Sequence, residues 1–144
     1  MDKGNCFLIV ELPKNMNHLV QMDISDSKSI VLELDGKNSP KTVKSFLEKL
    51  PFTVELYVWG EEIYTSSSPI KEPEENAKSP VSLNDVAYWP TGKAICLFFG
   101  PTPIGKKDEI TPASPVNVIG TIIDPDKSVL GFAEGKQATF RLES

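Results

Sequence analysis

The stretch Ser39–Val58, SPKTVKSFLEKLPFTVELYV, decides the fold because it changes from the period of a helix to that of a strand. The apolar residues of its first half recur at i, i+3, i+4 and i+7, and they are Val43, Phe46, Leu47 and Leu50. Ser39 can cap such a helix, Pro40 suits its first position and Pro51 ends it. We therefore predict one helix with a single buried stripe, which most simply covers an open end of a barrel.

Short β-prone segments surround this helix on both sides. Phe52–Val58 alternates apolar and polar residues, whereas Ala94–Phe99 is continuously apolar and predicts a strand buried on both faces. The other predicted strands are Cys6–Leu12, Leu19–Ile24, Ser29–Leu34, Glu61–Thr65, Val81–Trp89, Val116–Ile123 and Gln137–Leu142. Eight or nine short strands without strand–helix alternation favour a mostly β domain, built as a closed barrel or a sandwich.

Two connections stand out between these strands. Gly60 permits a sharp turn or a bulge between Phe52–Val58 and the strand that follows. Ser66–Pro80 contains three prolines, four serines and three glutamates, with Ile70 as its only large apolar residue. This composition predicts a long exposed loop, and it is the best candidate for mobility in the chain.

Composition places the chain among ordinary globular domains. It has 144 residues, 40% hydrophobic and 24% charged, which fits a single domain over residues 1–144. The formal net charge is −5, and the adjacent basic pair Lys106-Lys107 is followed at once by two acidic residues, so nucleic acid is not an expected partner. No apolar run approaches the ~20 residues that span a bilayer, and we expect a cytoplasmic protein that does not contact membranes.

The cysteines give no sign of a metal or redox site. Cys6 and Cys96 each lie in an apolar segment, where buried free thiols are the expected state and a disulfide is the alternative. Two cysteines and the single histidine, His18, do not make a zinc site, and no Gly-rich phosphate loop occurs. We expect neither a metal nor a cofactor.

Several short motifs have the order and spacing found in cyclophilins. They are Leu32-Glu33-Leu34, Pro40-Lys41-Thr42-Val43, Phe46-Leu47, Phe98-Phe99 and Val118-Ile119-Gly120-Thr121-Ile122. The chain resembles that family from about Leu8 to Leu142, and most closely a group of atypical prokaryotic cyclophilin-like proteins. The longer motifs of that group are Trp59–Tyr64, Tyr88–Gly100 and Pro112–Gly120. The resemblance implies a closed cyclophilin-like β-barrel of about eight strands with one helix covering an end.

Resemblance to cyclophilins also implies prolyl cis/trans isomerase activity, which needs an arginine that donates to the prolyl nitrogen as the amide twists. The family places this arginine near Val54–Val58, where the present chain has no cation. Its only arginine is Arg141, in the last predicted strand, and Leu97 stands where the family has a glutamine before Phe-Phe. The expected pocket histidine is absent as well. We therefore expect isomerase activity to be absent or feeble.

Aromatic residues at strand ends suggest a binding pocket instead. Tryptophan and tyrosine often line ligand pockets, because they combine apolar area with one hydrogen-bonding group, although they also commonly fill a barrel. We predict a pocket for a small molecule or short peptide, formed by Trp59, Glu61, Tyr64, Trp89, Lys93, Phe98 and Asn117. For Asn117, a bond to neighbouring backbone is the alternative, and for Lys93 an ordinary surface position.

Two further hypotheses remain open. The first is an enzyme, either a weak or divergent prolyl isomerase or an unrecognised activity that uses Glu61 or Glu62. Neighbours on a strand point to opposite faces, so these two carboxylates line one cleft only if a bulge at Gly60 reorients one of them. The second is a homo-oligomer that pairs through an exposed barrel edge.

Overall fold

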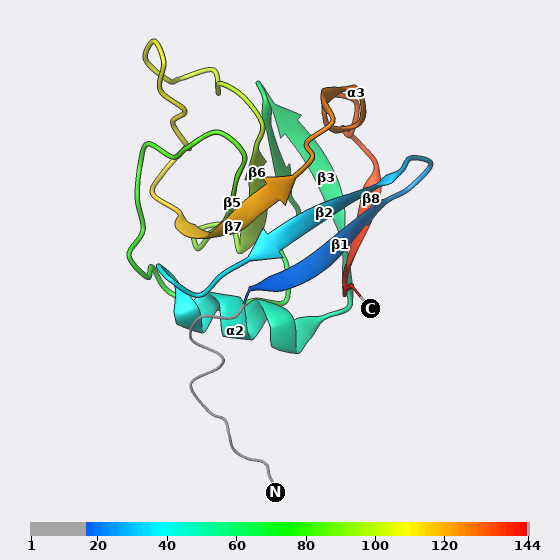
Figure 1. Ribbon diagram of the computed structural model, residues 1–144. Coiled ribbons are helices and arrows are strands. Elements are labelled where there is room, and N and C mark those ends of the chain that lie inside the picture. The colour runs from blue at the N-terminus through cyan, green and yellow to red at the C-terminus, as the bar shows by residue number, and fades with distance from the viewer. Residues whose placement is uncertain (1–16, 144) are drawn as a thin grey trace, which may run out of the picture.

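The computed structural model describes residues 17–143, and in this range eight strands close into an antiparallel barrel (Figure 1). The order around the barrel is β1-β2-β7-β5-β6-β4-β3-β8. The strands are β1 (His18–Ile24), β2 (Ser29–Leu34), β3 (Phe52–Trp59), β4 (Glu62–Thr65), β5 (Asp85–Trp89), β6 (Ala94–Phe98), β7 (Asn117–Ile123) and β8 (Gln137–Leu142). The predicted closed barrel is confirmed, and the predicted strand Cys6–Leu12 lies outside the described residues.

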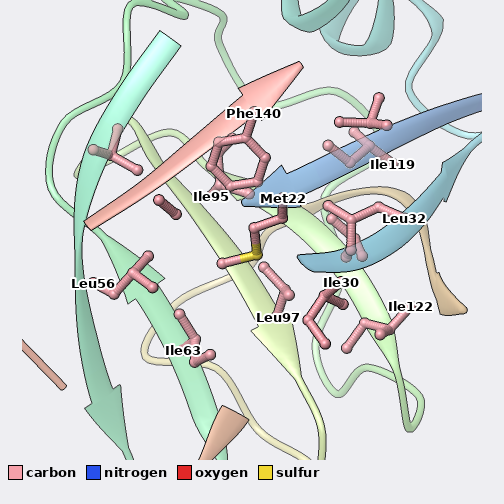
Figure 2. Close-up of a cluster of buried hydrophobic side chains, with 14 of the residues drawn as sticks. Met22, Ile30, Leu32, Leu56, Ile63, Ile95, Leu97, Ile119, Ile122 and Phe140 are labelled. Atoms are coloured by element: carbon pink, nitrogen blue, oxygen red, sulfur yellow. The ribbon is translucent and has the colours of Figure 1, made fainter. Parts of the chain in front are cut away.

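The barrel interior is filled by the inward side of each strand. Alternation sends Ile95 and Leu97 of β6 inward together with Ile63 of β4, and Figure 2 shows these side chains meeting Met22 and Phe140 from β1 and β8. All five of these side chains have no exposed surface. The interior is therefore a packed hydrophobic core and not a ligand cavity.

Helix α2 (Pro40–Lys49) lies across one end of the barrel, as its apolar stripe predicts (Figure 1). Phe46 is fully buried, and its ring centroid lies 5.4 Å from that of Phe52 and 5.6 Å from that of Phe140, both in edge-to-face geometry. Such contacts add to the burial of the ring itself. Phe46 is thus the side chain by which the helix closes the barrel.

The N-terminus of α2 is capped by Glu75, a residue far away in the sequence, and not by the N-cap residue Ser39. Ser39 occupies the N-cap position as predicted, but its hydroxyl makes no capping bond and donates instead to the Glu75 carbonyl oxygen at 2.9 Å. The Glu75 carboxylate accepts from the backbone N–H groups of Lys41 and Thr42, at 3.0 and 2.9 Å, and from the Thr42 hydroxyl at 2.8 Å. A carboxylate on free N–H groups at a helix N-terminus is favourable for hydrogen bonding and for the helix dipole.

The predicted connection Ser66–Pro80 is part of a longer connection over residues 66–84, much of which is exposed but which is attached to the barrel at several points. Ile70 is fully buried in the core, which corrects the expectation of a wholly exposed loop. Lys78 pairs with Val116, and Val81 pairs with Ile110, as isolated antiparallel bridges. The predicted strand Val81–Trp89 is therefore shorter, since continuous pairing begins only at Asp85.

A second, smaller set of buried residues lies on the outside of the barrel wall, and we call it the outer cluster. Its members are Val81, Ala87, Cys96, Phe98, Val116 and Val118, with Tyr64, Trp89 and Ile110 packed against them. Strand β6 faces the core with one side and this cluster with the other, so the prediction of burial on both faces is confirmed. The cluster is covered by the connections 66–84 and 99–116, which appear green and yellow beside the barrel in Figure 1.

Two remaining features complete the described part of the chain. A short helix that the sequence patterns did not predict, α3 (Lys127–Leu130), follows β7, and the Asp126 side chain accepts from the Ser128 N–H at its start. Over residues 17–143, neither helix has the length and apolar character needed to cross a membrane.

Candidate functional site

A pocket of about 220 Å³ opens on the outer cluster, on the barrel wall formed by β3, β4, β5 and β6. Its lining is mostly apolar and includes three aromatic side chains, one carboxyl group and one thiol. The lining residues are Trp59, Glu62, Tyr64, Trp89, Cys96, Pro112, Ala113 and Val116. Most small-molecule sites have this composition, in which apolar walls surround a few polar groups.

Strand alternation explains why the polar groups of this pocket face outward. Ile63 of β4 lies in the barrel core, so its neighbours Glu62 and Tyr64 lie on the opposite face. Cross-strand pairing then places Glu62 directly opposite Trp59, and Tyr64 directly opposite Cys96. The tight turn at Gly60, whose φ is +63°, thus joins the strands that carry Trp59 and Glu62, and the neighbouring strand β6 adds the Cys96 thiol to the same surface.

The aromatic rings are held by their surroundings. The indole N–H of Trp89 donates to the hydroxyl of Ser114, which ties β5 to the connection that covers the pocket. Gly92 lies against the same ring so closely that a Cβ atom there would come within 2.6 Å of the indole carbon Cζ3. The Tyr64 ring packs on that of Tyr57, with their centroids 5.3 Å apart. The walls of the pocket are therefore largely preformed.

Glu62 is the most unusual group in the pocket. Only 5% of its surface is exposed, and its Oε1 atom has no hydrogen-bond partner among the described residues. Burial raises the pKa of this carboxyl group to about 7, although a hydrogen bond from the Cys96 thiol opposes the rise. Burial, followed by the proximity of Glu62, raises the pKa of Cys96 well above its ordinary value, so the thiol stays protonated.

Three of the residues predicted for the site line the pocket together, namely Trp59, Tyr64 and Trp89. Glu61 does not, because its carboxylate points to Lys127 Nζ, 3.3 Å away, and its side chain packs over Gly100. Lys93 is exposed on the turn between β5 and β6, with a φ of +53°, and is not part of the lining. An ordinary surface position, which the sequence left open for this lysine, is what the structure shows.

The other two predicted residues are buried elsewhere. Phe98 has no exposed surface and belongs to the outer cluster without lining the pocket. Asn117 is also fully buried, and its amide oxygen accepts from the Glu75 N–H at 2.8 Å. Its amide nitrogen donates to the carbonyl of Pro73 at 3.0 Å and to the hydroxyl of Thr42 at 3.1 Å. Asn117 therefore follows the alternative reading, in which it fixes neighbouring backbone.

Sequence reasoning missed several lining residues, and it considered Glu62 for an unrecognised enzyme activity but not as a residue of the aromatic pocket. A signal for Glu62 did exist, because it stands two residues before Tyr64 on a predicted strand and so shares its face. The missed residues Pro112, Ala113 and Val116 come from a long connection whose path has no periodic signal. Cys96 was expected as a buried free thiol, with a disulfide as the alternative; it is a buried free thiol, and it also lines the pocket.

The charged residues relevant to isomerase chemistry lie apart from the pocket. The guanidinium of Arg141 pairs with the Asp23 carboxylate across β8 and β1, and neither residue lines the pocket. His18 begins β1 and is likewise not part of the lining. Within residues 17–143, no three His, Cys, Asp or Glu side chains lie close enough together to hold a metal ion.

Comparison with known proteins agrees with this architecture. The family model described as cyclophilin-like matches residues 18–141, nearly the whole described chain. The solution structure of the hypothetical protein AF2241 from Archaeoglobus fulgidus is 39% identical, with a TM-score of 0.75, and the match covers 94% of this chain and 100% of that one. No curated protein matches the chain. From the family match and the shared barrel, we conclude that the chain belongs to the cyclophilin-like family.

Proposed function

We propose that this protein binds a small molecule, or a single side chain of a short peptide, in the aromatic pocket, and that it is not an efficient prolyl isomerase. The observation that carries the proposal is the meeting of Trp59, Tyr64 and Trp89 around one preformed cavity that also contains the Glu62 carboxyl group. A volume of about 220 Å³ suits a compact ligand. For scale, a dry cavity of roughly 150 Å³ accommodates a benzene ring.

The position of the cations supports the second half of the proposal. Isomerisation of a prolyl bond must overcome a barrier of roughly 20 kcal/mol, and cyclophilin resemblance implies an arginine for that task. Arg141 is engaged by Asp23 on another part of the barrel wall, and none of the described lining residues is a lysine or an arginine. A protease-coupled assay with a prolyl peptide should therefore give rates far below those of a standard cyclophilin. Comparable rates would contradict the proposal.

The two tryptophans of the chain give a direct assay for binding. The sequence contains only Trp59 and Trp89, and both line the pocket, so the intrinsic fluorescence of the protein reports on this site. Titration with a panel of small apolar and aromatic compounds should change that fluorescence in a saturable way. Trp59→Ala and Trp89→Ala should abolish the response of the remaining tryptophan while the variants stay folded, and Lys106→Ala should leave it unchanged. If both tryptophan variants simply unfold, these residues are core and the proposed site is wrong.

A second candidate function is acid–base catalysis by Glu62, which is favoured by one specific observation. Its buried carboxyl group has a pKa of about 7, in the range where a side chain can both take up and release a proton near neutral pH. Glu61 is the weaker choice because Lys127 neutralises it outside the pocket. An activity whose rate changes with a pKa near 7 and disappears in Glu62→Gln, but not in Glu61→Gln, would establish this role.

A further inference from the structure

We propose that the ligand of this pocket is an alkylammonium group, which donates an N–H to the Glu62 carboxylate and packs its alkyl groups against Trp59, Tyr64 and Trp89. The inference rests on the proposed binding function and names the chemistry of the ligand. Three features of the pocket carry it: the unused acceptor of the Glu62 carboxyl group, the absence of a charge that compensates this group, and the aromatic walls.

The unused acceptor is Oε1 of Glu62. Buried polar atoms in proteins almost always have a hydrogen-bond partner, because an unpaired one loses its hydration without replacement. This oxygen is buried and has no partner within residues 17–143, and because the residue itself lines an open pocket, a ligand donor reaches the oxygen once the carboxyl group turns toward the pocket. The ionised carboxylate only accepts hydrogen bonds, so the partner missing from that form is a donor. A ligand with an N–H group supplies one.

The acidic group also lacks a compensating charge. No lysine or arginine is present among the described residues that line the pocket, and Glu61, next in the chain, is already paired with Lys127. The only other titratable groups of the lining are Tyr64 and the Cys96 thiol, whose raised pKa keeps it neutral. When the Glu62 carboxyl group is ionised, its charge is thus balanced by nothing in the pocket wall. A cationic ligand would balance it, and an anionic ligand would be repelled.

The aromatic walls favour a cation over a neutral apolar ligand. The faces of tryptophan and tyrosine rings attract cations, with tryptophan the strongest, and groups of such rings are a recurring site for ammonium ions. Here two tryptophans and one tyrosine share a cavity of about 220 Å³ with one carboxyl group. This combination provides cation–π attraction, apolar contact for alkyl groups and one acceptor. It therefore matches an alkylammonium ion in each respect.

Three probes of similar size separate charge from hydrogen bonding. Trimethylammonium has a charge and one N–H, tetramethylammonium has the charge without a donor, and tert-butanol has a donor without the charge. Tryptophan fluorescence should show trimethylammonium binding at least about tenfold more tightly than either of the others, because only it meets both requirements. Equal binding of tetramethylammonium would overturn the hydrogen bond to Glu62. Equal or tighter binding of tert-butanol would overturn the ammonium proposal while the binding function stands, and a pocket that binds no compound of any class would end both.

The pH dependence of trimethylammonium binding tests the role of Glu62. With a carboxyl pKa of about 7, the affinity should fall about tenfold between pH 8 and pH 6, since the probe stays charged and the carboxylate does not. Glu62→Gln should weaken binding at pH 8 by about tenfold or more, to the level of the wild type at pH 6 or below it, and should remove the pH dependence. The matched control Glu61→Gln should behave like the wild type, because that carboxylate faces Lys127. An affinity that does not change with pH would overturn the proposal.

A measurement on the wild-type protein covers the case in which Glu62→Gln fails to fold. NMR titration of the Glu62 carboxyl carbon should show its pKa falling below 7 when trimethylammonium saturates the pocket, because a bound cation favours the charged form. An unchanged pKa would overturn the proposed contact. Nα-acetyl-lysine methylamide then identifies the source of the ammonium group: tighter binding than trimethylammonium indicates a lysine side chain, and weaker binding indicates a free amine.

Discussion

The two faces of the barrel wall bury side chains of different kinds, although the same strands form both. On β4, Ile63 faces the interior and Glu62 faces the outer cluster, and their exposed fractions are 0% and 5%. The interior contains hydrophobic side chains that pack on one another. The outer face holds an ionisable group whose acceptor is left unpaired. The interior thus contributes to stability, whereas the buried carboxyl group of the outer pocket lowers it when that group ionises.

The largest effect is expected from the interior. Phe46→Ala should lower the free energy of unfolding by about 3–5 kcal/mol, the usual range for removing a fully buried phenylalanine. The loss arises because this ring joins helix α2 to Phe52 and Phe140 at the barrel end. Urea unfolding of wild type and variant provides the measurement. Phe132→Ala is the control, since that ring is 74% exposed and its loss should cost less than about 0.5 kcal/mol.

On the outer face, the ionisation of Glu62 is expected to change the free energy of unfolding by less than Phe46→Ala does, and this change depends on pH. The pKa of Glu62 is raised on folding, so the native state binds more protons than the unfolded chain between the ordinary value of 4.5 and about 7. Stability must then fall as pH rises through this window, by about 3 kcal/mol in total if the full shift is realised. Urea unfolding at pH 5 and pH 8 should show this decrease in the wild type and in Glu61→Gln.

Glu62→Gln isolates the contribution of this group, because the amide does not ionise. The variant should lack the decrease between pH 5 and pH 8 that the wild type shows. If variant and wild type change stability in parallel over this range, Glu62 titrates at an ordinary pKa in the folded protein. Ile63 and Glu62, on the two faces of β4, would then differ in polarity, but the burial of Glu62 would not lower the stability of the fold.

The difference between the faces also explains how far the sequence alone could predict this molecule. The interior follows from local periodicity, and the helix at Pro40–Lys49 and the doubly buried strand at Ala94–Phe98 were both predicted from it. The pocket depends on where the connections 66–84 and 99–116 pass over the outer face, which no periodic signal records. The positions of Trp59, Tyr64 and Trp89 at strand ends did indicate that they could share one surface, because alternation and turns are local properties, and the three do line one pocket. Glu62 was undervalued because its burial depends on the covering connection.

Asn117 and Glu75 illustrate the same limit. An asparagine inside an apolar strand must find hydrogen-bond partners when it is buried, but the sequence does not show which groups these partners are. In the structure its partners are the backbone of Pro73 and Glu75 and the hydroxyl of Thr42. Glu75 in turn caps helix α2 from 33 positions away, as counted to Thr42. Contacts between segments far apart in the sequence form only when the barrel folds. Local sequence patterns therefore placed Glu75 in an exposed loop and Asn117 in the predicted pocket.

Glu75 lies in the connection that covers the outer face, and it binds the helix that closes the barrel interior. Its removal is expected to lower the free energy of unfolding less than Phe46→Ala or the ionisation of Glu62 does. Glu75→Ala deletes the acceptor for the N–H groups of Lys41 and Thr42, and should cost about 1–2 kcal/mol, as loss of a helix cap does. Glu74→Ala, at an exposed neighbouring position, is the matched control and should be nearly silent. Urea unfolding at pH 7 compares the two variants, and equal stabilities would mean that the capping bonds contribute nothing.

The pH dependence of Glu75 should have the opposite sign to that of Glu62. Partial burial acts to raise its pKa, but the bonds from Lys41 and Thr42, with the charge of Lys41, outweigh this and lower it. Its stabilising contribution is therefore present above the ordinary value of 4.5 and is lost as pH falls through the lowered folded value. The stability difference between wild type and Glu75→Ala should shrink in acid, whereas that between wild type and Glu62→Gln should change between pH 5 and 8. The Glu75 carboxylate holds the covering connection to the helix that closes the barrel, whereas the Glu62 carboxylate, once ionised, destabilises the wall beneath that connection.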